Sequence, residues 1–184
     1  MKFNDLQPDF FVNKIEDVDL LLLRDMGYTS IIFDLDNTLV GWRSKEIKHG
    51  VSQWLMRAKD LGFRMCIVSN CLFLNRVRYF SEMLGIPFIF KAVKPRKKPF
   101  MDAVKILNSI ISETVVIGDQ VFTDVFGGNR IGFLTILVPP IDKREFYATL
   151  LQRTAEKILL SMMRKKGLLK SFPNEGNSKN SDAT

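Results

Sequence analysis

Residues 30–39 read SIIFDLDNTL, and this stretch decides how the whole chain is interpreted. Its apolar, β-branched start predicts a short buried parallel strand over 30–34. Alternate residues of an extended chain point the same way, so Asp34 and Asp36 both project from the carboxyl end of that strand. Open α/β sheets bind their ligands at this end, so the stretch indicates a ligand site.

Two carboxylates this close repel each other, and each raises the pKa of the other unless a cation lies between them. Mg²⁺ is the natural candidate, because it takes one or two carboxylates and keeps the rest of its shell for water and phosphate. Taken alone, the stretch also fits an ordinary turn in which Asp and Asn follow a strand and Thr38 caps a helix. Other segments of the chain decide between these interpretations.

Three later segments supply further polar groups at predicted strand ends. They are FRMCIVSN at 63–70, the basic loop KAVKPRKKPF at 91–100, and TVVIGDQ at 114–120, which Thr123-Asp124 follows. Each segment alone has the plain explanation of a turn or a solvated loop. In this order, and each beside a strand end, they supply the carboxylates, hydroxyl and cation that phosphoryl transfer requires.

The motifs DLDNT, VSN, KP and GDQVFTD resemble motifs I to IV of the haloacid dehalogenase (HAD) superfamily of phosphatases, over about residues 30–138. The longer wording FDLDNTLV, IVSN, PFIFKAVKP and VVIGDQVFTDVFGGNR is similar to one subfamily in particular. These are the capless class IIIA phosphatases of YqeG type, related to phosphatidylglycerophosphate phosphatase. The resemblance implies a phosphomonoester hydrolase that depends on Mg²⁺.

The resemblance also implies the residues that react. Asp34 would be the nucleophile that forms an aspartyl-phosphate, and Asp36 the general acid and then the general base. Both would touch Mg²⁺, Asp36 through its backbone carbonyl. Lys94 would neutralise charge on the phosphoryl group and on Asp34. Since Lys98-Pro99 is a second Lys-Pro pair, Lys98 is kept as the alternate to Lys94.

Further residues would bind phosphate and metal by the same resemblance. Ser69 and Asn70 would donate hydrogen bonds to the phosphoryl oxygens. Asp119 would complete the Mg²⁺ shell. Asp124 would orient the ligands or bind Mg²⁺ as a weaker ligand, and Thr38 would orient the ligands.

The alternation of apolar strands with helical patterns predicts an α/β fold, a doubly wound parallel sheet with short right-handed crossovers. We expect strands near 30–34, 64–68, 87–91, 114–118 and 133–138, and helices near 46–61, 73–84, 99–111 and 121–130. The gap 40–62 holds one helix and a short flap at 41–44, and the gap 71–90 holds one helix and one strand. Neither has room for a cap domain, so the site should be open to bulky or surface-bound substrates.

The C-terminal region is basic. Residues 142–170 hold eight lysines and arginines against three acidic residues, in a chain of net charge +7. Apolar residues recur there at helical spacing and predict a basic amphipathic helix over 142–166: Phe146, Leu150, Leu151, Ile158, Leu159, Met162 and Met163. Such a helix packs on the sheet, lies on an anionic membrane, or does both, with a basic edge of Arg153, Lys157, Arg164 and Lys165.

The length of 184 residues suits one domain, so we expect a single phosphatase domain over 1–170 and a disordered tail over 171–184. No apolar run reaches the length of a membrane span, no signal peptide is evident, and the two cysteines form no motif. We therefore expect a cytoplasmic protein, with peripheral contact at the inner membrane surface. The sequence leaves the oligomeric state open.

Three functions compete at this point. The first is an Mg²⁺-dependent phosphatase of a phospholipid head group such as phosphatidylglycerophosphate. The second is the same chemistry on a soluble sugar phosphate, a nucleotide or a nucleic-acid end, although no aromatic platform is interleaved with basic residues and no nucleic-acid partner is expected. The third is a non-enzymatic interaction module on the same fold, against which the four intact motifs argue.

Overall fold

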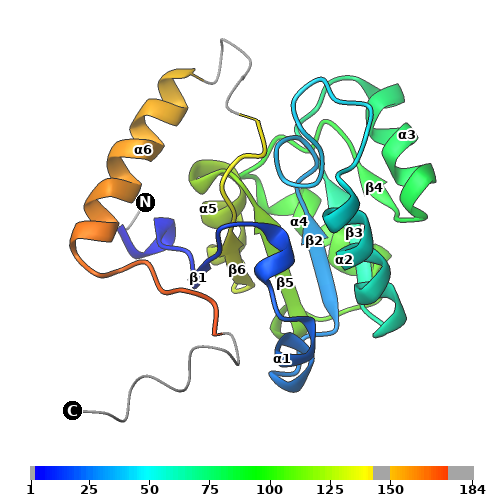
Figure 1. Ribbon diagram of the computed structural model, residues 1–184, viewed down its shortest axis with the longest axis horizontal. Coiled ribbons are helices and arrows are strands. Elements are labelled where there is room, and N and C mark those ends of the chain that lie inside the picture. The colour runs from blue at the N-terminus through cyan, green and yellow to red at the C-terminus, as the bar shows by residue number, and fades with distance from the viewer. Residues whose placement is uncertain (1–2, 143–149, 174–184) are drawn as a thin grey trace.

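The fold is built on a six-stranded sheet in which every pairing is parallel, with the order β1-β6-β5-β2-β3-β4 (Figure 1). The computed structural model describes residues 3–142 and 150–173. The strands are β1 (Phe10–Phe11), β2 (Ser30–Phe33), β3 (Arg64–Val68), β4 (Phe88–Ile89), β5 (Thr114–Gly118) and β6 (Leu134–Leu137).

The chain reverses its direction of travel across the sheet beside β2. From β2 it adds β3 and β4 on one side, and then it crosses to add β5 and β6 on the other. The carboxyl ends of β2 and β5 therefore meet at a topological switch point, where open α/β sheets form their ligand sites. The predicted α/β class and doubly wound parallel sheet are confirmed.

All five predicted strands are present, although β4 is shorter than the expected 87–91. The sixth strand, β1 at the sheet edge, was missed because two residues carry no periodic signal. Its register pairs Phe10 with Ile136 and Phe11 with Leu137, so the edge is set by contacts distant in sequence.

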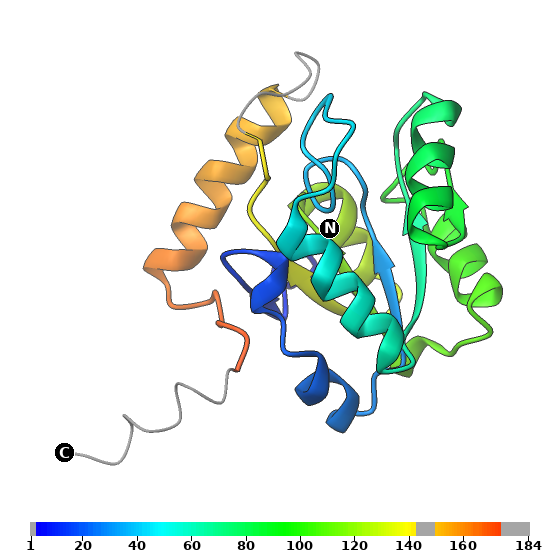
Figure 2. The same cartoon turned by 45° about the vertical axis from the view of Figure 1, so that its right-hand side comes forward.

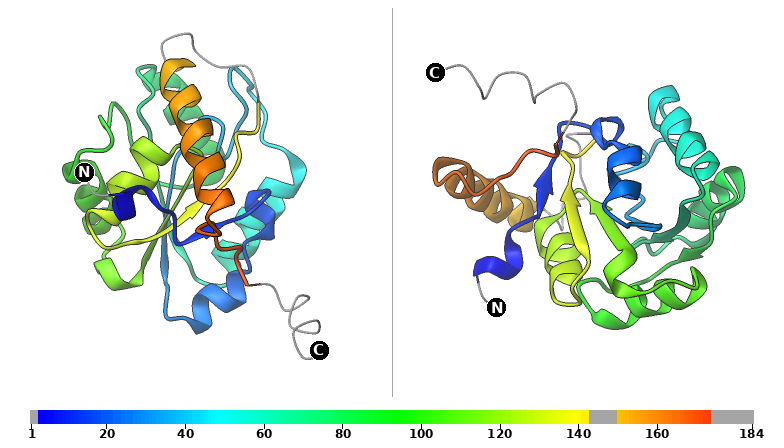
Figure 3. Two further views of the ribbon diagram at one scale, coloured as in Figure 1. Left: turned by 90° about the vertical axis from the view of Figure 1, so that its left-hand side faces the viewer. Right: turned by 90° about the horizontal axis from the view of Figure 1, so that it is seen from below.

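Helices cover both faces of the sheet (Figure 1; Figure 3, right). On one face lie α1 (Leu20–Asp25), α2 (His49–Asp60) and α3 (Leu74–Leu84), and on the other α4 (Lys97–Ile106) and α5 (Phe126–Asn129). Residues 121–125 precede α5 as a π-helical turn, and short 3₁₀ turns occupy residues 3–6, 15–17 and 111–113.

The alternation of side chains along β2 divides the core. Phe33 points to the α2 side, where its ring lies 6.0 Å from that of Trp54. Ile32 belongs to the cluster on the opposite face, together with Phe100 of α4. All four residues of β2 are buried, as expected of a central parallel strand covered on both faces.

The two gaps that could hold a cap domain hold small elements only, within the described residues. The chain from β2 to α2 is a loop that rises from the carboxyl end of the sheet beside α3 (Figure 2). The connection from β3 to β4 carries the single helix α3. The expected absence of a cap from these gaps agrees with this architecture.

The C-terminal helix α6 (Leu150–Lys165) lies along the β1 edge of the sheet (Figure 3). Its inward face buries Leu159 and Met163 in a cluster with Val121. Ile158 and Met162, which the sequence grouped in the same stripe, are exposed. Residues 143–149 of the predicted helix lie outside the described part. No helix in residues 3–142 or 150–173 is both long and apolar enough to cross a bilayer.

The boundary that we expected for the tail, residue 171, is too early in the sequence. Ser171 forms a bridge with Phe11, and the amide N–H of Phe172 donates to the carbonyl of Phe11 at 3.3 Å. The ring of Phe172 is buried and meets the ring of Phe10 edge-on at 5.0 Å. These contacts extend the folded domain beyond 170 by pairing it with the β1 edge, and the remainder of the predicted tail, 174–184, lies outside the described residues.

Candidate active site

A buried lysine joins two carboxylates at the carboxyl end of the sheet. The Nζ atom of Lys94 lies 2.6 Å from Oδ1 of Asp34 and 2.6 Å from Oδ1 of Asp124. The side chains of Lys94 and Asp124 are each 2% exposed, and that of Asp34 is 10% exposed. We call these three residues the Lys94 centre.

Strand ends position the carboxylates of the Lys94 centre. The amide N–H of Asp34 donates to the carbonyl of Ile117 at 3.1 Å, so Asp34 extends the ladder between β2 and β5. Asp124 accepts a hydrogen bond from the amide N–H of Gln120 at 3.2 Å. A Cβ on Gly118 would clash with the side chain of Asp124, so the glycine of the GDQVFTD motif leaves room for that carboxylate.

Asn70 positions Lys94 through the backbone. Its Oδ1 accepts from the amide N–H of Lys94 at 2.7 Å, and its Nδ2 donates to the carbonyl of the same residue at 3.4 Å. The structure therefore ties the side chain of Asn70 to the lysine loop. Substrate binding by Asn70 stays a prediction.

Burial raises the pKa of Asp34 to about 7, with the Lys94 ammonium acting in the opposite direction and the Asp124 carboxylate adding to the rise. Burial by itself lowers the pKa of Lys94, but the carboxylates of Asp124 and Asp34 outweigh it and hold that pKa above its ordinary value. Lys94 is therefore a fixed positive charge, and Asp34 is a carboxylate that further positive charge would stabilise.

Asp119 follows β5 and is buried beside an arginine from α6. Its backbone carbonyl accepts from Nη1 of Arg153 at 2.7 Å, and Oδ2 of Asp119 accepts from Nη2 of the same guanidinium. The hydroxyl of Thr38 donates to Oδ1 of Asp119 at 3.4 Å. Burial raises the pKa of Asp119 well above its ordinary range, although Arg153 opposes the rise.

Arg153 also fastens α6 to the turn that follows Asp119. Its Nη1 lies 3.2 Å from Oε2 of Glu156, and Oε1 of Glu156 accepts from the amide N–H of Phe122 at 3.0 Å. We call Arg153, Glu156 and their partners Asp119 and Phe122 the Arg153 clasp. Arg153 is buried, so its assignment to a basic edge was wrong: its charge is turned toward a carboxylate of the site.

A second arginine holds Asp36. In Arg76, on the first turn of α3, Nε donates to Oδ1 of Asp36 at 2.8 Å and Nη2 lies 2.7 Å from the same oxygen. The guanidinium also donates to the carbonyl of Ser44 at 2.6 Å and to that of Gly41 at 3.2 Å. Arg76 thus connects Asp36 to the 41–44 flap, and we call this set the Arg76 bridge.

Ser69 lies at the same edge, at the end of β3. It is buried, and its Oγ accepts from the amide N–H of Cys71 at 3.0 Å. Lys98 lies elsewhere: its side chain is 83% exposed and pairs with Asp102 one helical turn away. The structure therefore brings Lys94, and not the alternate Lys98, to Asp34.

The sequence did not identify Arg76 as a site residue, and it placed Arg153 on the basic edge of the C-terminal helix. Arg76 lies in the first turn of a helix, where a cation opposes the helix dipole. That mismatch is a signal in the sequence, because a basic residue at this position is stabilised when an anion lies nearby. The identity of the anion depends on the tertiary fold.

The donors at this edge fit Mg²⁺. Asp34 and Asp119 come from adjacent strands, and burial raises the pKa of both, so a cation between them would relieve an electrostatic cost. No three acidic, histidine or cysteine side chains in the described ranges form a ready-made metal cage. Mg²⁺ needs no such cage, because it binds through one or two carboxylates and fills its shell with water and phosphate.

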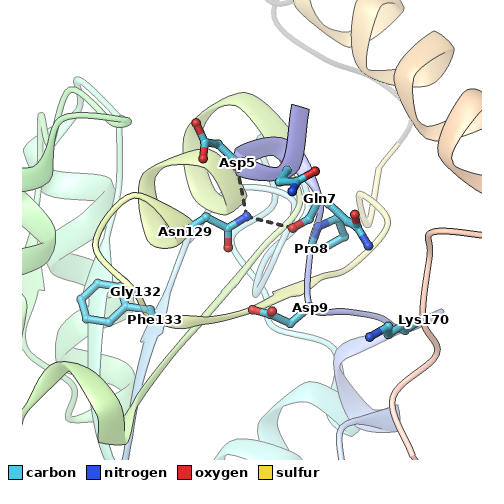
Figure 4. Close-up of a pocket in the computed structure, with 9 residues that line it drawn as sticks. Asp5, Gln7, Pro8, Asp9, Asn129, Gly132, Phe133 and Lys170 are labelled. Atoms are coloured by element: carbon cyan, nitrogen blue, oxygen red, sulfur yellow. Dashed lines mark hydrogen bonds between the residues drawn. The ribbon is translucent and has the colours of Figure 1, made fainter. Parts of the chain in front are cut away.

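A polar hollow of about 510 Å³ lies at the amino end of β6, away from these residues (Figure 4). Its polar groups serve the fold. The Nδ2 of Asn129 donates to the carbonyls of Asp5 and Gln7, and Asp9 accepts from the amide and hydroxyl of Thr135. The hollow therefore marks where the N-terminal segment attaches to α5 and β6.

Comparison with known proteins agrees with this geometry. A HAD-hydrolase-like family model matches residues 92–140. The chain is 42% identical over 160 residues to "Probable phosphatase YqeG" of Bacillus subtilis, covering 87% of this chain and 92% of that protein. It is 29% identical over 170 residues to "Phosphatidylglycerophosphate phosphatase 1, chloroplastic/mitochondrial" of Arabidopsis thaliana, spanning 88% of this chain and about half (49%) of that protein.

Among solved structures, the fold is similar to that of the cobalt-bound deoxy-D-mannose-octulosonate 8-phosphate phosphatase YrbI of Haemophilus influenzae. The TM-score is 0.52 at 15% identity, over 78% of this chain and 93% of that one. The fold and the site together define a HAD-type phosphatase, a phosphomonoester hydrolase. Within that superfamily, the chain belongs to the capless phosphatases of YqeG type.

Proposed function

We propose that the chain hydrolyses the phosphomonoester of a phospholipid head group, such as phosphatidylglycerophosphate, through an aspartyl-phosphate on Asp34 and with the aid of Mg²⁺. The observation that carries the chemistry is the Lys94 centre. It combines a buried carboxylate at a strand end with a fixed cation 2.6 Å from it. That arrangement supports attack on an anionic phosphoryl group, because the cation offsets the charge that the reaction brings together.

In the first step an oxygen of Asp34 attacks phosphorus, and the bond between phosphorus and the ester oxygen breaks. Asp36 gives its proton to the departing alkoxide, so the leaving group departs as an alcohol. The Arg76 bridge holds the carboxyl of Asp36 in one orientation for this transfer. Lys94 keeps its charge throughout.

In the second step Asp36 takes a proton from a water molecule as that water attacks phosphorus. The bond between phosphorus and Asp34 then breaks, which releases inorganic phosphate and restores the carboxylate. The side chain of Asp36 keeps 16% exposure, so a water molecule can reach it for the second proton transfer.

The remaining site residues bind and orient. Asp34, Asp119 and the backbone carbonyl of Asp36 would hold Mg²⁺, which supplies Lewis-acid charge cancellation when bound. Ser69 would donate its hydroxyl proton to a phosphoryl oxygen, and Asn70 would fix the Lys94 loop and bind phosphate with its remaining N–H. Asp124 and Thr38 would orient Lys94 and Asp119 respectively, as their hydrogen bonds suggest.

The lipid part of the proposal rests on three supports. No cap domain occupies the described connections around the site, so a substrate embedded in a surface could reach it. The exposed cations Lys91, Arg96 and Lys97 lie on the loop that carries Lys94 or at the start of α4, and they suit an anionic surface. The Arabidopsis relative is named for phosphatidylglycerophosphate. We propose accordingly that the protein works as a peripheral protein at an anionic membrane.

The test is a panel of phosphomonoesters with and without Mg²⁺. It includes phosphatidylglycerophosphate in mixed micelles, sn-glycerol 3-phosphate as its soluble head-group counterpart, and an aryl phosphate. We expect hydrolysis to require Mg²⁺ and kcat/KM to be highest for the lipid. A higher kcat/KM for the glycerol phosphate would favour the soluble-substrate alternative, and a folded protein that hydrolyses none of them would favour an interaction module.

A further inference from the structure

Three large apolar side chains are exposed beside the Lys94 centre. Leu72 and Phe73 are each 69% exposed, and Val93 is 53% exposed. Among the large apolar side chains whose exposure the structure describes, Leu72 and Phe73 are the most exposed, followed by Ile158 at 57%. Single exposed apolar residues are ordinary, but a group of them next to a site marks an interaction surface.

Backbone hydrogen bonds join the two loops that carry these residues. Leu72 and Phe73 follow β3, and Val93 follows β4. The amide N–H of Lys91 donates to the carbonyl of Cys71 at 3.3 Å, and that of Ala92 donates to the carbonyl of Ser69 at 3.0 Å. The two loops are thus fixed to each other, and they carry two residues of the site, Ser69 and Lys94.

Exposed cations accompany the apolar group. Lys91, Arg96 and Lys97 are exposed on the same loop or at the start of α4. Apolar side chains flanked by lysine and arginine are typical of surfaces that rest on anionic lipid, because the first enter the acyl boundary and the second meet the head groups. We define the docking rim as Leu72, Phe73, Lys91, Val93, Arg96 and Lys97.

We propose that the docking rim seats the carboxyl end of the sheet on an anionic lipid surface, so that the Lys94 centre faces the membrane. The proposal rests on the lipid substrate proposed above and adds the surface through which the enzyme reaches it. We place the membrane contact at the docking rim and not at the outer face of α6. The rim lies on the loops that carry Ser69 and Lys94, whereas α6 reaches the site only through Arg153, whose charge is turned inward to Asp119. The helix itself runs along the β1 edge of the sheet (Figure 3).

The conformation of two rim residues allows substitutions that should spare the fold. Phe73 is the N-cap residue of α3 and makes no side-chain cap bond, so Phe73→Ser introduces a preferred capping residue. Val93 has φ +56°, which is strained for a β-branched residue, so Val93→Asn should relieve strain while it removes an apolar group. Loss of lipid binding in these variants would not reflect misfolding.

The experiment measures co-sedimentation of the full chain with vesicles of phosphatidylglycerol and phosphatidylcholine in equal parts, and with phosphatidylcholine alone. The rim variants are Leu72→Ser/Phe73→Ser and Val93→Asn, and the matched control is Ile106→Ser/Ile110→Ser, two exposed residues near the amino end of the sheet. We expect the double rim variant to lose at least ~10-fold in binding to the anionic vesicles, and the control to match the parent.

Charge is tested separately. Lys91→Glu/Arg96→Glu/Lys97→Glu should abolish the preference for anionic vesicles, while Lys157→Glu/Lys165→Glu on α6 should leave it. Every apolar rim variant should keep the parent rate on a soluble aryl phosphate. Unchanged vesicle binding in the double rim variant would overturn the proposal, and loss confined to the α6 variant would move the docking surface to α6.

Two further outcomes separate this proposal from the proposed function. If the parent hydrolyses phosphatidylglycerophosphate in micelles but the rim variants bind vesicles normally, the function stands and the docking rim fails. If the rim variants lose vesicle binding but the parent hydrolyses no lipid, the docking rim stands and the lipid substrate fails.

If light scattering shows the parent as an oligomer that the rim variants dissociate, and vesicles do not bind, the rim is a protein interface.

Discussion

The Lys94 centre and the Arg76 bridge each join a strand-end carboxylate to a cation, but they differ in burial. Lys94 and Asp124 are 2% exposed, whereas Arg76 and Asp36 keep 18% and 16% exposure. The Lys94 centre holds its charges in fixed positions, as the proposed nucleophile and its counter-ion require. The Arg76 bridge reaches solvent, as the proposed general acid and base requires.

The difference in burial fits the different tasks that we propose for the two neighbouring aspartates. Burial raises the pKa of Asp34 to about 7 in the absence of a metal, and the positive charges around it favour the reactive carboxylate. Asp36 points instead to an arginine that also holds the carbonyl groups of Gly41 and Ser44. The 41–44 flap is therefore connected to Asp36 through Arg76.

The largest expected effect comes from a substitution in the Lys94 centre. Asp34→Asn removes the attacking charge while keeping the shape, so hydrolysis of every substrate should fall by ~10³-fold or more. The fold should persist, because Lys94 keeps Asp124 as a partner. Steady-state assays with circular dichroism as the control measure both. Substantial turnover by a folded Asp34→Asn protein would contradict the covalent mechanism.

The next effect comes from the Arg76 bridge. Arg76→Gln should lower kcat roughly 10–100-fold on alkyl phosphates, because Asp36 loses its orienting partner. The loss should be smaller on aryl phosphates, whose leaving groups need little proton transfer, and Asp36→Asn should show the same pattern. Arg78→Gln, exposed on the same helix, is the matched control.

The role proposed for the Arg76 bridge is tested by how the loss of rate varies with the leaving group. Equal losses on aryl and alkyl phosphates would argue against Asp36 as the acid and against Arg76 as its positioning residue. Arg76→Lys should restore only part of the rate, because an ammonium cannot reproduce the planar set of bonds to Asp36, Gly41 and Ser44.

A smaller effect is expected from the Arg153 clasp. Arg153→Gln removes the cation that orients Asp119, so Mg²⁺ should bind roughly 10-fold more weakly in calorimetry. Lys157→Gln, exposed on the same helix, should bind Mg²⁺ as the parent does. Unchanged or tighter Mg²⁺ binding by Arg153→Gln would show that the Arg153 clasp only holds α6 against the domain.

The smallest effect is a pH dependence of stability. The pKa of Asp34 rises from 3.8 to about 7 on folding, so the folded metal-free protein binds more protons than the unfolded chain between these values. Its free energy of unfolding should therefore fall as pH rises from about 4 to 7, by ~1–3 kcal/mol. Denaturant titrations without metal measure this slope.

Asp34→Asn is the control for that slope. The variant should show a shallower decline, with the remainder due to Asp119, whose pKa burial also raises. A parent whose stability rises over the same interval would show that Asp34 is ionised in the folded metal-free protein at acid pH.

The sequence by itself determined the parallel sheet and the polar residues at its carboxyl edge. Asp34 and Asp36 directly follow the strand that ends at Phe33, so both belong to its carboxyl end. The resemblance of the four motifs then assigned tasks to these residues. Such local signals extend over a few neighbouring residues, which is why they can be found without a structure.

Only the tertiary structure decided which cations meet these carboxylates. Lys94 and Lys98 both precede proline, but the loop held by Asn70 turns Lys94 toward Asp34 and leaves Lys98 in solvent. Arg153 lies 34 residues from Asp119 along the chain and reaches it only because α6 packs at the sheet edge. Which carboxylate a long cationic side chain reaches depends on how helices and loops pack against the sheet. The periodicity of the sequence does not encode that packing.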